Sequence, residues 1–427
     1  MTKKKFDYFC YFILGILIYQ FLNKLSWWQP NFSSDYNTHW AYLAATTFDF
    51  IDPKWDFPQW VNGPWYYFLY SYFIGPIFFF LFYLGKITVH EAAMYTFLSG
   101  NFILSLILFY AVIKLSKILF SKVLARFAYV AIIMFLPFTY KSFFNYGVEN
   151  FAMALTPLVI YYLIQSYKKN KLNYWIKLSI VFSLVCATKI SFLIPLFFLL
   201  VGSIILCFIK KKRVNKKYFL PFLSTLFLIY FSFLITGSSL LNNNDIRNID
   251  RGYGDVPSMS VFYTVDFVDA YKNPNRFEQN YSMINAWSLD FFGDYYGNFK
   301  TDRKYNSFDK TTILNRNSLY ISILFFTWYF ILLIKNYKFE KFISFKSLLT
   351  LFFFLMFIEA ISYCFFVFMS EKAQSLNLRY WGFYVFFLAF PIANYFNNLK
   401  VRLYEKINLI ILLLVITSAF VQMYIIL

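Results

Sequence analysis

Long apolar segments recur along almost the whole chain, and they restrict its fold more than any other feature of the sequence. The chain has 427 residues, is 60% hydrophobic and is only 14% charged. A helix crosses a hydrocarbon core of about 30 Å at about 1.5 Å per residue, so about eleven segments are long enough to span. We therefore expect an all-α polytopic membrane protein. The predicted spans are 6–22, 93–113, 123–139, 150–167, 175–190, 191–209, 218–236, 317–334, 345–369, 380–396 and 407–427.

A further apolar run, 65–84, is interrupted by Gly75-Pro76. The basic residues decide how it is interpreted, because cytoplasmic loops are rich in Lys and Arg. If 65–84 does not cross the membrane, the N-terminus and all the basic loops lie on one side. We therefore predict an interfacial or re-entrant aromatic helix here and a cytoplasmic N-terminus. The basic loops, which hold more than half of the 40 Lys and Arg, are 114–126, 168–177, 210–217, 335–346 and 400–406.

The net charge of +19 is explained by these loops, so it does not indicate a nucleic-acid partner. The first apolar run follows Lys3-Lys4-Lys5, as in a signal sequence, but 23–27 has no small-residue cleavage site. We expect an uncleaved first span in the cell membrane. The four Cys lie in apolar segments without metal-ligand spacing, which predicts neither a zinc site nor a disulfide framework.

The polar residues divide the chain into three parts. Residues 1–236 form an N-terminal transmembrane bundle whose first outer loop is 23–92. Residues 237–316 are too polar for lipid, and their aromatic content predicts an ordered lid packed on the membrane face. Residues 317–427 return to transmembrane helices. The acids gather in the two outer loops, so we expect the chemistry on the extracytoplasmic side.

Asp35 and His39 are the first candidates for that chemistry. They are four residues apart, which places them on one face of a short helix. Asp35 follows two serines, and a helix N-cap is the alternative interpretation. A carboxylate beside the bilayer with an imidazole one turn away is also a candidate base for deprotonating a hydroxyl.

Isolated charges elsewhere need a partner or a function. Glu149 is expected at the outer end of a span, either as a first-turn acid or as a carboxylate that lines an outer cavity. Lys189 lies between two apolar segments, where it snorkels, pairs with an acid or binds an anionic ligand. Arg379 is an interface anchor or an anion ligand. His90-Glu91 is interpreted as an ordinary helix start that is less expected to line the site.

With these residues placed, most of the chain resembles the GT-C superfamily of integral-membrane glycosyltransferases, close to bacterial relatives of the dolichyl-phosphate-mannose protein mannosyltransferases. The similarity consists of weak motifs that occur in the same order as in the family and that are all predicted on the outer face of the membrane. The Gly63–Tyr67 stretch carries only one of the two prolines of the family's Pro-Pro-Leu-Tyr-Tyr segment. The matching stretches are Asp35–Trp40, Gly63–Tyr67 with Tyr66 and Tyr67, Glu149, Ala187–Ser191, Trp287 and Phe292–Tyr295 with Asp294.

The resemblance implies transfer of a sugar, with inversion, from a polyprenyl-phosphate donor to an envelope glycan, lipid or protein acceptor. Asp35 is then the base, and His39 orients it or contacts the sugar. Lys189 and Arg379 bind the donor phosphate, and the 65–84 helix is the surface along which the lipid tail approaches. Glu149 positions the acceptor or, with Asp35, holds a divalent metal ion if one takes part.

Two other classes of function stay open. An O-antigen-type polysaccharide polymerase also has about a dozen spans and a large outer loop, and it would depend on arginines such as Arg251 or Arg276. A lipid-linked sugar flippase or another transporter would line a path through both halves of the membrane with charges. The clustering of isolated charges at the outer side favours the transferase.

Overall fold

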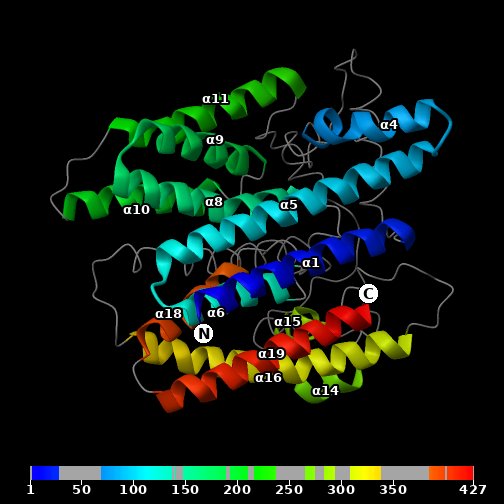
Figure 1. The fold of residues 1–427 in the computed structure, drawn as a ribbon, viewed down its shortest axis with the longest axis vertical. Helices are drawn as coiled ribbons and strands as arrows, with labels where there is room; N and C mark the ends of the chain where they lie inside the picture. Colours follow the sequence, from blue (N-terminus) through cyan, green and yellow to red (C-terminus); the bar gives the residue numbers. More distant parts are fainter. Residues whose placement is uncertain are drawn as a thin grey trace, which may run out of the picture.

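The structure is a computed structural model that describes residues 2–27, 69–136, 139, 148–188, 193–209, 216–236, 265–274, 283–293, 308–337, 384–399 and 402–426. All regular secondary structure in these residues is helical, and most of the helices lie alongside one another (Figure 1). The elements are α1 (Lys3–Trp27), η1 (Tyr70–Ile74), α4 (Gly75–Tyr83), α5 (Val89–Leu119), α6 (Val123–Phe135), α8 (Val148–Lys169), α9 (Leu172–Thr188), α10 (Leu193–Ile209), η3 (Lys216–Tyr218), α11 (Phe219–Thr236), α14 (Phe267–Lys272), α15 (Met283–Phe292), α16 (Phe308–Tyr337), α18 (Tyr384–Asn398) and α19 (Arg402–Ile426).

The predicted spans correspond to helices, except for 345–369, which lies outside the described residues. Within the described ranges, four helical stretches are long and apolar enough to cross a membrane: Lys3–Asn23, Glu91–Leu119, Thr312–Ile334 and Leu403–Gln422. Shorter apolar helices accompany them. The prediction of a helical chain with membrane-spanning segments is therefore supported, and the count of eleven spans stays a prediction.

The helix α5 connects the two halves of the bundle. On one side it packs against α8, which leads to α9, α10 and α11; on the other side it packs against α1 and α6 (Figure 1). Beyond α6 lie α18, α16 and α19. Nearly every side chain of α6 is buried, from Leu124 to Phe135. A helix that is apolar on all sides belongs in a core, and α6 occupies that place here.

Both ends of α5 are fixed by specific hydrogen bonds. At the start, Thr88 and Glu91 form a capping box, in which the Thr88 N–H donates to Glu91 Oε2 at 2.7 Å and the Glu91 N–H donates to Thr88 Oγ1 at 3.2 Å. This arrangement satisfies two amides that have no partner within the helix. It confirms the predicted helix start at His90-Glu91. At the other end, Arg126 Nε donates to the Phe120 carbonyl oxygen at 2.9 Å.

Three of the connections expected to be basic lie beside helix ends at one end of the bundle. The turns between α5 and α6 and between α8 and α9, the end of α18 and the start of α19 lie at the left of Figure 1, the end where α1 begins. Hydrogen bonds hold part of this end together, because Asn397 Oδ1 accepts from the backbone amides of Ser121 at 2.9 Å and Lys122 at 3.2 Å. Lys122 Nζ also donates to the Leu399 carbonyl oxygen. These contacts hold α5, α6 and α18 together at this end, and the side of the membrane on which the end lies stays a prediction.

Large apolar side chains cover outward-facing stripes of several helices. Phe73, Ile77 and Phe80 are 62–74% exposed along η1 and α4, and Leu223 and Phe227 are 57% and 65% exposed on α11. These residues are three or four positions apart, so each set forms one continuous face. Exposed apolar faces of this kind are typical of a surface that contacts lipid.

The described part of the 65–84 run packs alongside α5. Tyr70, in the π-helical turn η1, is 2% exposed, and its hydroxyl donates to Asn101 Oδ1 at 2.7 Å. The Tyr70 ring lies over Gly100, where any Cβ atom would collide with it. From this contact η1 and α4 run back along α5 to the turn at Gly85. The described residues of this run therefore lie alongside α5, and the interfacial or re-entrant placement of 65–84 stays a prediction.

We predict that Gly100→Ala destabilises the protein by about 1–3 kcal/mol, the usual cost of overpacking a close contact. The Tyr70 ring is buried and hydrogen-bonded, so it has little room to move. The measurement is the thermal unfolding midpoint of the detergent-purified chain. Gly15→Ala in α1 is the matched control, because a Cβ atom there meets nothing within 4 Å. Equal unfolding midpoints for the two variants would show that the Tyr70 ring moves aside without loss of stability.

Candidate functional site

Most of the predicted site residues lie outside the described residues. This is true of Asp35, His39, Tyr66, Tyr67, Lys189, Arg379 and Asp294. Glu149 and Trp287 lie in described helices, and of these two residues only the backbone is described. The described helices next to these positions nevertheless show where some of the predicted segments lie in the bundle.

The hairpin of α8 and α9 brings two of the predicted segments to the same end of the bundle. Glu149 is the second residue of α8, in its first turn as expected, and α9 ends at Thr188, the residue before Lys189 in the sequence. The helices pack side by side and are joined at Asn170, which has a φ of 49°. At about 1.5 Å per residue, Glu149 is about 30 Å from this turn and Thr188 about 26 Å. The start of α8 and the end of α9 therefore differ in height along the hairpin by no more than about one helical turn.

Buried polar residues accompany both helix ends. Asn150, next to Glu149, is 3% exposed, and Thr188 is fully buried with its hydroxyl donating to the Leu184 carbonyl oxygen at 2.6 Å. The other end of the hairpin carries the lysines that flank the turn. The two ends of the hairpin thus differ in kind: one is a buried polar end, and the other is an exposed basic end.

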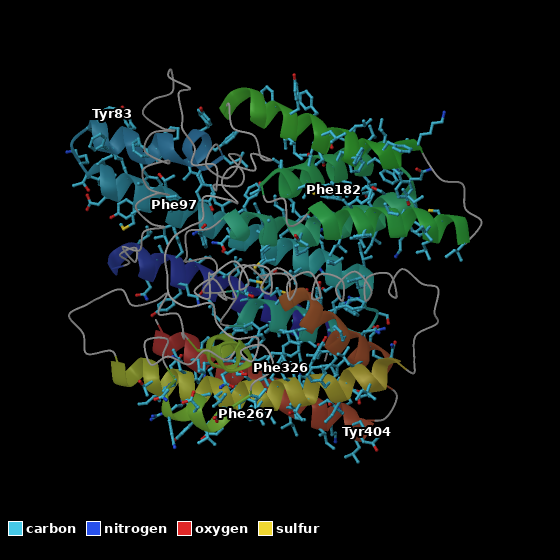
Figure 2. All side chains as sticks on the ribbon, turned by 180° about the vertical axis from the view of Figure 1, so that it is seen from behind. Tyr83, Phe97, Phe182, Phe267, Phe326 and Tyr404 are labelled. Atoms are coloured by element: carbon cyan, nitrogen blue, oxygen red, sulfur yellow. The ribbon has the colours of Figure 1, made fainter. Side chains whose placement is uncertain are left out.

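The segment 237–316 is folded against the bundle where it is described. Its helix α15 packs along α16, and Ser318 Oγ and Ser322 Oγ each donate to the Ser288 carbonyl oxygen at 2.8 Å. The Phe292 amide donates to Ser318 Oγ at 3.0 Å. The α16 residue Phe326, labelled in Figure 2, places its ring centroid 5.1 Å from that of Phe291. We call this contact the α15–α16 seam.

The short helix α14 is tied to the same place. Asn285 of α15 exchanges two hydrogen bonds with the backbone of Asp266, at 2.7 and 3.3 Å. Asn315 Nδ2, fully buried on α16, donates to the Pro274 carbonyl oxygen at 3.0 Å. Gly293 fits beside Asn315 only because it lacks a Cβ atom, which would collide with the Asn315 side chain. The helix α16 begins at Phe308, so the predicted boundary between loop and span at 316/317 falls inside a helix.

Sequence reasoning singled out Phe292 and Gly293 but not their partners on α16. Asn315, Ser318 and Ser322 recur at three- and four-residue spacing, which places them on one face of α16. A polar stripe on an otherwise apolar span predicts a helix–helix contact. The contact face of α16 could therefore have been predicted from the sequence. For Asn101 the sequence offers only a single amide within an apolar run, and its partner Tyr70 is 31 residues away.

Among the described residues, no group of three or more His, Cys, Asp or Glu could hold a metal ion. Asp35 lies outside these residues, and the Glu149 side chain is not described, so their role as metal ligands stays a prediction. Cys10, Cys186 and Cys207 are free thiols, and Cys364 lies outside the described residues.

Comparison of the chain with models of known protein families, with curated proteins and with solved structures finds no match.

We predict that Asn315→Leu loosens α14 and α15 from α16. The substitution leaves the buried Pro274 carbonyl oxygen without its donor, which costs about 1–3 kcal/mol. Limited proteolysis of the purified chain should then cut faster within 265–293, while the helices of the bundle stay protected. Asn317→Leu, two residues away on the exposed face of α16, should leave the cleavage rate unchanged. Equal rates in both variants would contradict a role for Asn315 in holding α14.

Proposed function

We propose that the chain is an integral-membrane glycosyltransferase that moves a sugar from a polyprenyl-phosphate donor to an acceptor on the extracytoplasmic face, with inversion. The sequence motifs identify the candidate site residues. The proposal carries with it a cytoplasmic N-terminus and an interfacial or re-entrant helix at 65–84, of which the described part, η1 and α4, packs along α5.

The observation that supports this proposal most is the pairing of helix ends in the α8–α9 hairpin. The first turn of α8, which contains Glu149, and the last turn of α9, which precedes Lys189, lie at one end of the bundle. The lysines of the connecting turn lie at the other end. A donor with a phosphate and an acceptor that loses a proton need a cation and a carboxylate on the same side of the membrane. The hairpin suits that requirement.

The proposed reaction is a single displacement. The acceptor oxygen attacks the anomeric carbon of the sugar and loses its proton to the Asp35 carboxylate. The bond from the anomeric carbon to the phosphate oxygen breaks, and its electron pair leaves with the polyprenyl phosphate. Lys189 and Arg379 stabilise the phosphate by charge-assisted hydrogen bonds. Attack on the face opposite the leaving group inverts the anomeric configuration.

We expect Asp35→Asn to lower turnover by about 100-fold or more, because the amide cannot accept the proton. The measurement is the lipid-linked glycan profile, by mass spectrometry, of cells that express the variant or the parent chain at equal levels. In the variant a polyprenyl-phosphate monosaccharide should accumulate, and one sugar decoration should disappear from an envelope component.

Asp52→Asn is the control, because it removes a carboxylate from the same predicted outer loop. It should leave the profile like that of the parent chain. If the Asp35→Asn profile also equals the parent profile, Asp35 is not the base. The polymerase is then favoured if exchange of Arg251 or Arg276 abolishes the product.

Lys189→Met should raise the apparent KM for the donor, since it removes a cation from the proposed phosphate site. The assay titrates membranes with the polyprenyl-phosphate sugar whose mass the glycan profile provides. Lys86→Met, in the exposed turn between α4 and α5, is the control for loss of one positive charge. An unchanged donor response in Lys189→Met would assign this lysine a structural role.

A further inference from the structure

The turn of the α8–α9 hairpin carries exposed lysines, and buried aromatic side chains pack beneath it. Trp175 is 1% exposed, its Nε1 donates to Asn170 Oδ1 at 3.3 Å, and its ring lies 4.5 Å from that of Tyr218, measured between centroids. Tyr218 is 4% exposed, and its hydroxyl lies 3.4 Å from Cys207 Sγ. These contacts hold the start of α9 against η3. We call the exposed Lys168, Lys169, Lys171 and Lys177 above this base the lysine hairpin.

Three of the four lysines act on one tyrosine, Tyr174. Lys169 Nζ donates to the Tyr174 hydroxyl at 3.2 Å and lies 5.0 Å from the centre of its ring. The pKa of Tyr174 lies below its ordinary value because of this hydrogen bond and because the charges of Lys169, Lys171 and Lys177 favour the phenolate. An anion near Tyr174 would therefore meet several cations at once.

The surrounding sequence offers these lysines no carboxylate. From Asn150 to Asn244 the chain contains neither Asp nor Glu, so every charge on α8 after Glu149, on α9 and on η3 is positive, and α10 and α11 carry no charge. Like charges held close together repel one another, and a bound anion relieves this repulsion. We therefore expect an anionic partner from outside these helices to bind favourably at the hairpin.

An apolar stripe begins directly beside the lysines. Leu172, Ile176 and Ile180 are 47–53% exposed and follow one another at four-residue spacing along α9. A partner that covers both features needs an anionic head and a hydrocarbon tail. That combination favours a phospholipid over a soluble anion, a nucleic acid or an acidic peptide.

We propose that the lysine hairpin binds the phosphate headgroup of an anionic phospholipid, whose acyl chains lie along Leu172, Ile176 and Ile180. The site is at the basic end of the bundle, far from the start of α8. It is independent of the proposed transferase activity and would persist if that proposal failed.

The test is native mass spectrometry of the full-length chain in detergent, with phosphatidylglycerol and phosphatidylcholine of identical acyl chains. The parent chain should bind phosphatidylglycerol more tightly, and added salt should weaken this preference. The triple variant Lys168→Gln, Lys171→Gln and Lys177→Gln should bind it at least about tenfold more weakly, since each lysine near an anionic surface contributes to binding. Lys169 is kept so that its contact with Tyr174 remains.

Two further variants make the result decisive. Lys3→Gln, Lys4→Gln and Lys5→Gln together remove the same charge from the start of α1 and should leave phosphatidylglycerol binding nearly unchanged. Lys168→Arg, Lys171→Arg and Lys177→Arg keep the charge and should bind like the parent chain. Equal losses in both glutamine variants, or no preference for phosphatidylglycerol in the parent, would overturn the proposal. So would displacement of the lipid by inorganic phosphate at the same concentration, which would indicate a soluble anion instead.

Discussion

Polar groups that lie within an apolar bundle must find their partners inside the protein, because neither lipid nor a packed core supplies hydrogen bonds. Much of the described architecture depends on this constraint. Tyr70 and Asn101 join the π-helical turn to α5, and Ser318 and Ser322 join α15 to α16. In each case a buried hydrogen bond joins a short element to a long helix, and in α15 it lies beside the buried rings of Phe291 and Phe292. Polar contacts and apolar packing therefore act together where the short helices attach.

The same constraint fixes the helices at the basic end. Trp328 Nε1 of α16 donates to Asn408 Oδ1 of α19 at 2.8 Å, and Asn408 Nδ2 donates to the Tyr404 carbonyl oxygen at 2.7 Å. Tyr404 is labelled at the edge of the bundle in Figure 2. The turn between α5 and α6 is bound to Asn397 at the end of α18. Two sets of contacts thus connect helices that are remote in sequence, and they keep the basic connections together.

The positions of the long helices could be predicted from the sequence, because length and apolar composition identify a span without knowledge of its neighbours. The start of α5 could also be predicted, since Thr88 and Glu91 form a local motif. The start of α16 at Phe308 could not, because its first turns carry Asp309 and Lys310 and no apolar pattern. Contacts such as Trp328 with Asn408, 80 residues apart, depend on the packing of whole helices.

The candidate site was predicted less completely than the fold. The first-turn position of Glu149 agrees with the structure, and the remaining predicted residues, or their side chains, lie outside what the structure describes. The residues that sequence reasoning missed, such as Ser318 and Asn315, are small or uncharged. Charged residues in apolar surroundings attract attention because their burial is costly, whereas a serine or an asparagine can bond to a backbone carbonyl group and leaves a weaker signal.

On the proposed topology, the α8–α9 hairpin connects the two membrane surfaces. Its helices are long enough to separate a buried polar end from an exposed lysine end by about 26–30 Å, close to the thickness of the hydrocarbon core. If the lysines bind lipid headgroups on one side, they fix the depth of α8 and α9 in the bilayer. The depth of the opposite end then follows, because the helices are rigid. A headgroup site on one face thus sets the height at which a polyprenyl phosphate would meet the polar end on the other face.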